Sequence, residues 1–145
     1  RTATAADTAA NAKVTVTSSA VAKSDITVAV YRGTDSTTPI ASSASKIDNT
    51  AGAAHTSPAD TATGDKDWML TYWADRSDTT TGWTAPAGPT VRVAGDASDT
   101  GSAHVTAVMA DSNGPVTSGA QGQLTATANG SSSRGASFSI LLRSN

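Results

Sequence analysis

Apolar and polar residues alternate along several short runs of the chain. Residues 14–17 read VTVT and residues 26–31 read ITVAVY, so β-branched residues recur at every second position. This period of two places successive side chains on opposite faces of an extended strand. Turn-forming Gly, Pro, Asn and Asp separate the runs, and no stretch shows a convincing helical period. The pattern predicts half-buried strands over both runs, with a turn at residues 32–35.

The stretch 66–75, KDWMLTYWAD, differs from the other runs because it is apolar on both faces. Its even-numbered positions from Trp68 to Tyr72 would share one face of a strand, and its odd-numbered positions from Met69 to Trp73 the other. Such a strand is typically central in a sheet and covered on both sides. Further strands are predicted over residues 39–47, around His55, and over 90–93, 102–111, 122–128 and 136–143.

The number and spacing of these strands indicate the fold class. About nine short strands separated by turn signals are typical of a sandwich or barrel. The sequence therefore predicts an all-β protein, an antiparallel β-sandwich of jelly-roll type. A length of 145 residues fits one domain, so residues 1–145 are expected to form a single β-sandwich domain. Because the chain begins with Arg1 rather than Met, we expect it to be a fragment or a processed piece.

Large aromatic side chains are few, and most of them lie in one stretch. The chain has 3 Trp, 2 Tyr and 1 Phe, and all three Trp fall within residues 66–88. A small sandwich needs a few large anchors, since aromatic side chains bury the most surface. We therefore expect Trp68 and Tyr72 to be core residues.

A second interpretation of this stretch is sugar binding. Aromatic rings stack on the apolar faces of sugar rings, and short polar side chains hydrogen-bond the hydroxyls. Loops at strand ends commonly carry such functions. The alternative is that the last two Trp rings form a hydrophobic lid over one end of the sandwich or contact a neighbouring subunit. The candidate ligand-binding residues are Trp73, Trp83, Asp75, Arg76 and Asp78.

Composition and charge exclude several classes of function. The net charge is -2 and no basic stripe occurs, so a nucleic-acid partner is not expected. No apolar run approaches the roughly 20 residues of a membrane span, so membrane insertion is not expected either. The bias toward Ser, Thr, Ala and Gly, with few Lys, is typical of an exported or virion protein.

Residue types that carry catalysis or hold metals are sparse. Cys and Glu are absent, and His55 and His104 are the only histidines, whereas zinc needs three or four ligands. Aspartates in residues 74–78 and 95–102 have oxygens that suit Ca2+, but such loops are more typical of Asx turns. No nucleophile elbow or glycine-rich phosphate loop occurs. We predict no enzymatic activity, no cofactor and no metal site.

Several short motifs occur in a fixed order along the chain: SDITVAVYRGTD at 24–35, YWAD at 72–75, WTAPAG at 83–88, ADSNGPV at 110–116 and LTAT at 124–127. With them the chain resembles a domain that recurs in secreted actinobacterial proteins and in minor tail or other virion proteins of actinobacteriophages. The resemblance implies a jelly-roll-like β-sandwich without an agreed active site. It also implies additional strands before residues 1–17, which this chain lacks and which a neighbouring chain could supply.

The sequence as a whole favours a binding or structural role. We expect a non-catalytic structural or adhesion module displayed on a virion, as a phage tail or decoration protein, or on a cell surface. It would act in assembly or host-surface attachment. Its expected partners are other subunits of a larger assembly, including copies of itself, or a cell-surface glycan. The alternative is a carbohydrate-binding accessory module of a secreted, extracellular actinobacterial protein.

Overall fold

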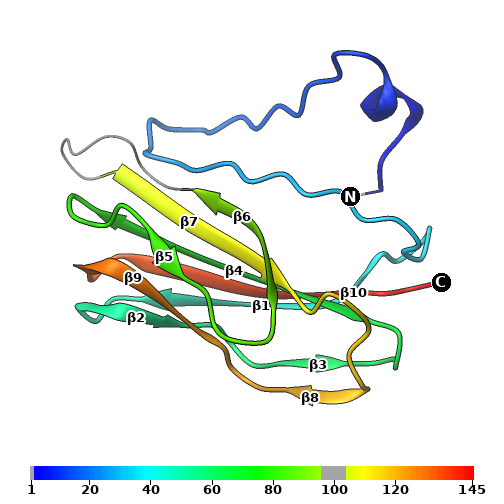
Figure 1. The fold of residues 1–145 in the computed structure, drawn as a ribbon. Helices are drawn as coiled ribbons and strands as arrows, with labels where there is room; N and C mark the ends of the chain where they lie inside the picture. Colours follow the sequence, from blue (N-terminus) through cyan, green and yellow to red (C-terminus); the bar gives the residue numbers. More distant parts are fainter. Residues whose placement is uncertain (1, 96–103) are drawn as a thin grey trace.

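The computed structural model describes residues 2–95 and 104–145, and over these residues the protein is all-β (Figure 1). A single turn of 3-10 helix, Ala5–Thr8, precedes the strands. The strands are β1 (Ile40–Asp48), β2 (Gly52–Thr56), β3 (Asp60–Ala62), β4 (Trp68–Ser77), β5 (Trp83–Thr84), β6 (Thr90–Gly95), β7 (His104–Asp111), β8 (Gly119–Gln121), β9 (Thr125–Ser132) and β10 (Gly135–Leu142).

The strands form three antiparallel sheets in a sandwich-like arrangement. The five-stranded sheet has the order β1-β10-β4-β7-β6, and the three-stranded sheet has the order β2-β9-β5. A two-stranded sheet of β3 and β8 extends one end of the molecule (Figure 1). The predicted antiparallel all-β sandwich is therefore confirmed, and the jelly-roll connectivity stays a prediction.

The core lies between the five-stranded and three-stranded sheets. Trp73, with none of its surface exposed, packs there with Val108, Ala110 and Ala126. A second cluster of Ala62, Met69 and Leu141 continues the core toward the two-stranded sheet. Most of these residues are small, so Trp73 is the largest fully buried side chain among the described residues.

Strand β4 has the predicted central position in its sheet, between β10 and β7. Its side chains alternate between two faces as predicted, but the core face is the one that holds Met69, Thr71 and Trp73. Trp68 and Tyr72 are half-buried on the opposite, outer face. The expectation that these two residues build the core was wrong, because the period of two fixes which residues share a face and not which face meets the second sheet.

The outer face of the five-stranded sheet is covered by the N-terminal segment. Residues 9–34 run as two extended lengths joined by a bend at residues 19–20, and they cross over the sheet on the side away from β2, β5 and β9 (Figure 1). We call residues 9–21 the outer arm and residues 22–34 the inner arm, which lies nearer to the sheet. The strands predicted over 14–17 and 26–31 are not formed, because neither run pairs with another strand among the described residues.

The other predicted strands are largely confirmed. Runs 39–47, 66–75, 90–93 and 136–143 correspond to β1, β4, β6 and β10, and His55 lies in β2. β9 begins three residues after the predicted start at 122 and continues four residues past the predicted end at 128. Residues 102 and 103 of the predicted strand at 102–111 lie outside the described residues, and the rest is β7. The short strands β3 and β8 were not predicted, because three residues are too few to show a period.

Candidate functional site

The structure disperses the candidate ligand-binding residues. Trp73 and Asp75 are buried, with 0% and 2% of their surface exposed, because they lie on the core face of β4. Trp83 in β5 is half-buried, whereas Arg76 and Asp78 are exposed. Trp73, a candidate ligand-binding ring, is therefore enclosed in the core. These five residues do not form one accessible surface.

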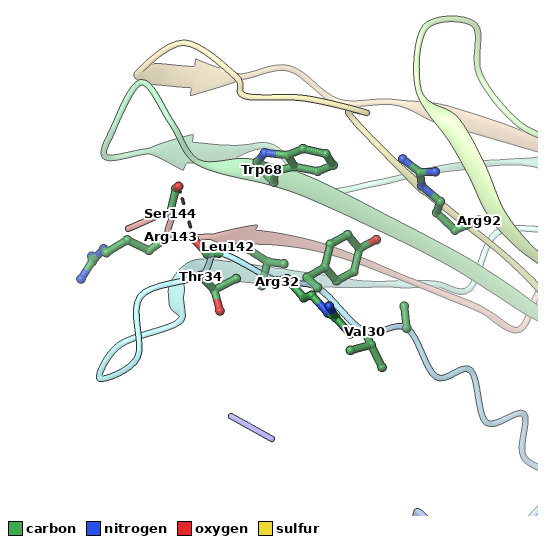
Figure 2. A pocket seen from close by; sticks show the side chains of 11 residues that line it. Val30, Arg32, Thr34, Trp68, Arg92, Leu142, Arg143 and Ser144 are labelled. Carbon is green, nitrogen blue, oxygen red and sulfur yellow. Dashed lines mark hydrogen bonds between the residues drawn. The ribbon is translucent and has the colours of Figure 1, made fainter. Parts of the chain in front are cut away.

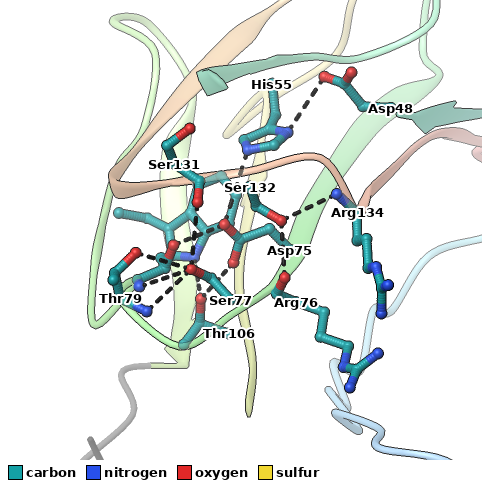
Figure 3. Close-up of polar contacts among 12 residues, drawn as sticks. Asp48, His55, Asp75, Arg76, Ser77, Thr79, Thr106, Ser131, Ser132 and Arg134 are labelled. Atoms are coloured by element: carbon teal, nitrogen blue, oxygen red, sulfur yellow. Dashed lines mark hydrogen bonds and ion pairs between the residues drawn. The ribbon is translucent and has the colours of Figure 1, made fainter. Parts of the chain in front are cut away.

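Asp75 is instead the centre of a buried polar network (Figure 3). Its carboxylate accepts hydrogen bonds from Thr80 Oγ1 at 2.7 Å and from Thr106 Oγ1 at 3.1 Å. Thr106 Oγ1 in turn accepts a bond from Trp83 Nε1 at 3.0 Å. The network ties β4, β7 and β5 together, and it explains why the WTAPAG segment lies against the end of the sandwich.

A buried histidine extends this network toward β1. His55, 2% exposed, has Nδ1 3.3 Å from Asp48 Oδ2 and Nε2 3.9 Å from Asp75 Oδ2, so the ring lies between two carboxylates (Figure 3). Gly135 lies beside the ring, and a Cβ at that position would be 2.6 Å from His55 Nδ1. Any side chain at position 135 would therefore displace the imidazole.

The cluster differs from a catalytic triad in its geometry and burial. A histidine between carboxylates resembles part of a catalytic triad, which also needs a nucleophile at the second ring nitrogen. Here both ring nitrogens face aspartates, and the ring has almost no exposed surface. The described residues contain no group of three or more metal-ligating side chains placed to hold an ion. The cluster places the imidazole of one sheet beside two carboxylates of the other, and neither ring nitrogen makes a hydrogen bond among the described residues.

An accessible site lies on the other face of the five-stranded sheet. A groove of about 340 Å3 runs between the inner arm, the start of β4 and the end of the chain (Figure 2). Trp68 and Leu142 come from the sheet, and residues 29–34 of the inner arm form the opposite wall. The rings of Trp68 and Tyr31 meet edge to face, with their centroids 6.3 Å apart. The groove thus has an aromatic centre.

One end of the groove is fixed by a charged cluster. Arg92 donates two hydrogen bonds to Asp111, from Nε at 2.7 Å and from Nη2 at 2.9 Å, and Tyr31 Oη donates a third at 2.8 Å. Burial disfavours the charged carboxylate, but the bonds from Arg92 and Tyr31 outweigh it and hold the pKa of Asp111 below its usual range. Burial and the bond to Asp111 raise the pKa of Tyr31. The cluster anchors the inner arm at Tyr31.

A second tyrosine anchors the inner arm near its start. Tyr72 Oη, on the outer face of β4, donates a hydrogen bond of 2.9 Å to Asp25 Oδ2. Burial and the bond to Asp25 raise the pKa of Tyr72. The two tyrosine–aspartate bonds are reciprocal, since the arm supplies the carboxylate in one pair and the hydroxyl in the other.

The β-branched apolar residues of both arms are largely exposed. Ile26, Val28 and Val30 of the inner arm are 58%, 54% and 79% exposed. In the outer arm, Val14 and Val16 are 59% and 64% exposed. Neither arm belongs to a sheet of the described strands. The outer arm, residues 9–21, therefore presents β-branched side chains on a backbone that no strand ladder engages.

Comparison with known proteins gives no relative: no family model, no curated protein and no solved structure matches the chain. Among the described residues, no helix combines the length and the apolarity that a membrane crossing needs. The functional argument therefore depends on the geometry of the groove and the arms.

Only part of this groove could be recognised from the sequence. Trp68 was recognised as important but assigned to the core. Arg92 carried a usable signal, since it is the one charged residue in the apolar run TVRV. Its partner Asp111 is 19 positions away along the chain, and only the pairing of β6 with β7 brings the two together.

Proposed function

We propose that the protein is a non-catalytic structural module that assembles with further copies of its own chain by strand addition through the outer arm. The observation that supports this most directly is the outer arm itself. It has the alternating pattern of a strand, yet its valines are exposed and it pairs with no described strand of its own chain. A strand sequence without a partner favours pairing with another chain.

The sheets supply a place for such a strand. The five-stranded sheet ends at β1 and at β6, each of which pairs with one neighbour only. The outer side of an edge strand presents unpaired backbone N–H and C=O groups, which accept an added strand from another chain. Exposed Ile47 in β1 and Val91 in β6 offer apolar contacts beside these edges.

A second copy is the partner that this arrangement fits. One chain carries both an unpaired strand-forming arm and open edges, so two copies can each donate an arm and accept one. The net charge of -2 is low, and repulsion between copies is correspondingly weak. Such an assembly suits a module displayed on a virion or a cell surface, which remains the prediction from the sequence resemblance and the polar composition.

The lack of catalytic activity is part of the same proposal. The one histidine–carboxylate arrangement among the described residues that resembles catalytic machinery is His55 with Asp48 and Asp75. It is enclosed between the sheets, and a substrate would have to open the sandwich to reach it. The carboxylate of Asp75 is already engaged by the hydroxyls of Thr80 and Thr106, which link β4 to β7 and to the loop that follows β4.

The test is the mass of the particle in solution, measured by light scattering across a wide range of concentration. The wild-type chain, with a monomer mass of 14.4 kDa, should form dimers or larger species as its concentration rises. The double variant Thr15→Pro/Val16→Pro removes two successive backbone N–H groups, one of which faces the acceptor strand, and it should shift the assembly toward monomer. The double variant Thr15→Val/Val16→Thr keeps both N–H groups and β-branched side chains, and it serves as the matched control.

Two results would contradict the proposal. One is a wild-type chain that stays monomeric at every concentration. The other is a double-proline variant that assembles as the wild type does, since strand addition through this part of the outer arm could then not be the contact. Because the outer arm pairs with no described strand in the monomer, the thermal midpoint of the monomeric variants should be unchanged.

A further inference from the structure

The groove beside Trp68 combines aromatic rings with several arginines. Its volume of about 340 Å3 lies within the usual size of small-ligand sites, which are mostly apolar with a few directed polar groups. Arg92 and Arg143 lie at its two ends (Figure 2). We propose that this groove binds an acidic sugar unit, a uronic acid or a similar carboxylated monosaccharide of a surface glycan.

The aromatic centre of the groove fits the ring of such a sugar. Trp68 is half-buried, so part of its indole is open to a ligand, and the edge-to-face contact with Tyr31 holds the ring in place. The indole Nε1 makes no hydrogen bond within the described residues, whereas Trp83 Nε1 is engaged by Thr106. Trp68 therefore offers a flat apolar surface together with one unused donor.

The charge of the groove fits a carboxylate. Three of the ten Lys and Arg residues line it, although the chain as a whole carries a net charge of -2. Arg92 is largely occupied by Asp111, and Arg143 donates to Thr38 Oγ1 while its side chain extends away from Trp68 (Figure 2). Arg32 has no ion pair or side-chain hydrogen bond among the described residues. Its exposed guanidinium is the group that would hold the carboxylate, in the bidentate geometry that arginine favours.

Two other ligand classes fit less well. A neutral sugar would use the aromatic surface but leave Arg32 without a partner. A nucleic acid needs a run of basic residues along its backbone, whereas two of the three arginines here already bond Asp111 and Thr38, and the chain carries a net charge of -2. The inference does not depend on the proposed assembly, because Val14 and Val16 of the outer arm are not among the residues that line the groove.

The test compares two ligands that differ only at one carbon, methyl β-glucuronide and methyl β-glucoside, titrated into the full chain. The tryptophan indole N–H signals in an NMR spectrum report the site. The signal of Trp68 should shift, while those of Trp73, which is buried, and Trp83, which is bonded to Thr106, should not. The glucuronide should bind about tenfold more tightly than the glucoside, as expected for one added charge-assisted hydrogen-bond pair.

Two variants separate the parts of the site. Arg32→Gln should abolish the preference for the glucuronide, and Arg134→Gln, an equal change of charge at an exposed residue of the β9–β10 turn, should leave it intact. Trp68→Ala should abolish binding of both sugars. Phe138→Ala, which removes a 40% exposed ring from the same sheet outside the groove, is its control.

Inorganic phosphate is the third ligand in the titration. If phosphate displaces the glucuronide and binds with the same affinity, the groove is a simple anion site and the inference of a sugar is wrong. Equal binding of the two sugars, or an unchanged preference in Arg32→Gln, would overturn the inference as well. None of these results depends on the mass of the assembly, so the failure of one proposal does not decide the other.

Discussion

Strand β4 and the inner arm lie against each other. They differ in the kind of side chain that each turns toward the other. β4 presents Trp68 and Tyr72 to the arm, and it buries Trp73 on its other face. The arm turns Asp25 and Tyr31 toward the sheet and leaves its alternate apolar residues in solvent. The contact between the two is therefore polar and local, although both sequences alternate in the same way.

The backbones differ even more than the side chains do. β4 pairs in continuous register with β10 from Trp68 to Asp75 and with β7 from Leu70 to Ser77. The inner arm has no such ladder: two tyrosine–aspartate bonds hold it to the sheet, and at its end Gly33 O accepts a backbone hydrogen bond from Asn145. Cooperative ladders and buried surface give the high opening free energies in a protein, and isolated contacts give low ones. We therefore expect β4 to open only with global unfolding and the arm to open on its own.

The largest expected effect tests the core side of this comparison. Trp73→Ala should lower the free energy of unfolding by about 3–5 kcal/mol, because it leaves a large cavity at the one fully buried tryptophan. A urea melt measures the change, and Trp68→Ala, on the arm side of the same strand, should cost clearly less. Equal losses in the two variants would contradict the assignment of the two faces.

A somewhat smaller effect is expected at the buried network. Asp75→Ala leaves the hydroxyls of Thr80 and Thr106 without their acceptor and His55 without one of its two carboxylates. Unsatisfied buried polar groups of this kind should lower the free energy of unfolding by about 3 kcal/mol. Asp78→Ala, an exposed carboxylate three residues away, should stay within about 0.5 kcal/mol. If the two losses in a urea melt were alike, the network would contribute nothing to stability.

The two faces of β4 also show how far the sequence was informative. The alternation of 66–75 correctly placed β4 at the centre of a sheet and correctly divided its residues between two faces. It could not assign Trp73 to the core, because both faces are apolar and both are covered. Contacts between residues far apart in the chain decide which face of β4 meets the second sheet and which face meets the arm.

The same limit explains why the strand predicted over residues 26–31 is not formed and why the buried cluster around Asp75 was not predicted. Residues 26–31 have the local preference of a strand, but a strand needs a partner, and sequence alternation does not supply one. The burial of Asp75 and His55 was hidden for a similar reason. His55 in β2 meets Asp48 of β1 and Asp75 of β4 only after the two sheets pack, so neither carboxylate could be matched to the histidine from spacing alone.

The smallest expected effect tests the arm side of the comparison. Tyr72→Phe removes the hydroxyl that donates to Asp25, and it should lower the free energy of arm opening by about 1 kcal/mol. Amide exchange should accelerate in residues 22–34 and stay unchanged in β4 and β10. A fall in the protection of the whole sheet would mean that the arm is part of the cooperative core.

High pH should release the arm in the same way, and the direction follows from the raised pKa values of Tyr31 and Tyr72. Each hydroxyl must keep its proton to donate to its aspartate, so arm docking raises both pKa values above the usual 10.0. By linkage the stabilisation is fully present below that value and is lost as the pH rises through the higher pKa of the docked state.

Tyrosinate absorbance should therefore appear at a higher pH than for free tyrosine, and amide exchange in the inner arm should rise with it. In Tyr72→Phe only the Tyr31 part of this transition should remain. Ionisation of both tyrosines at their ordinary pKa would show that the arm is not docked in solution.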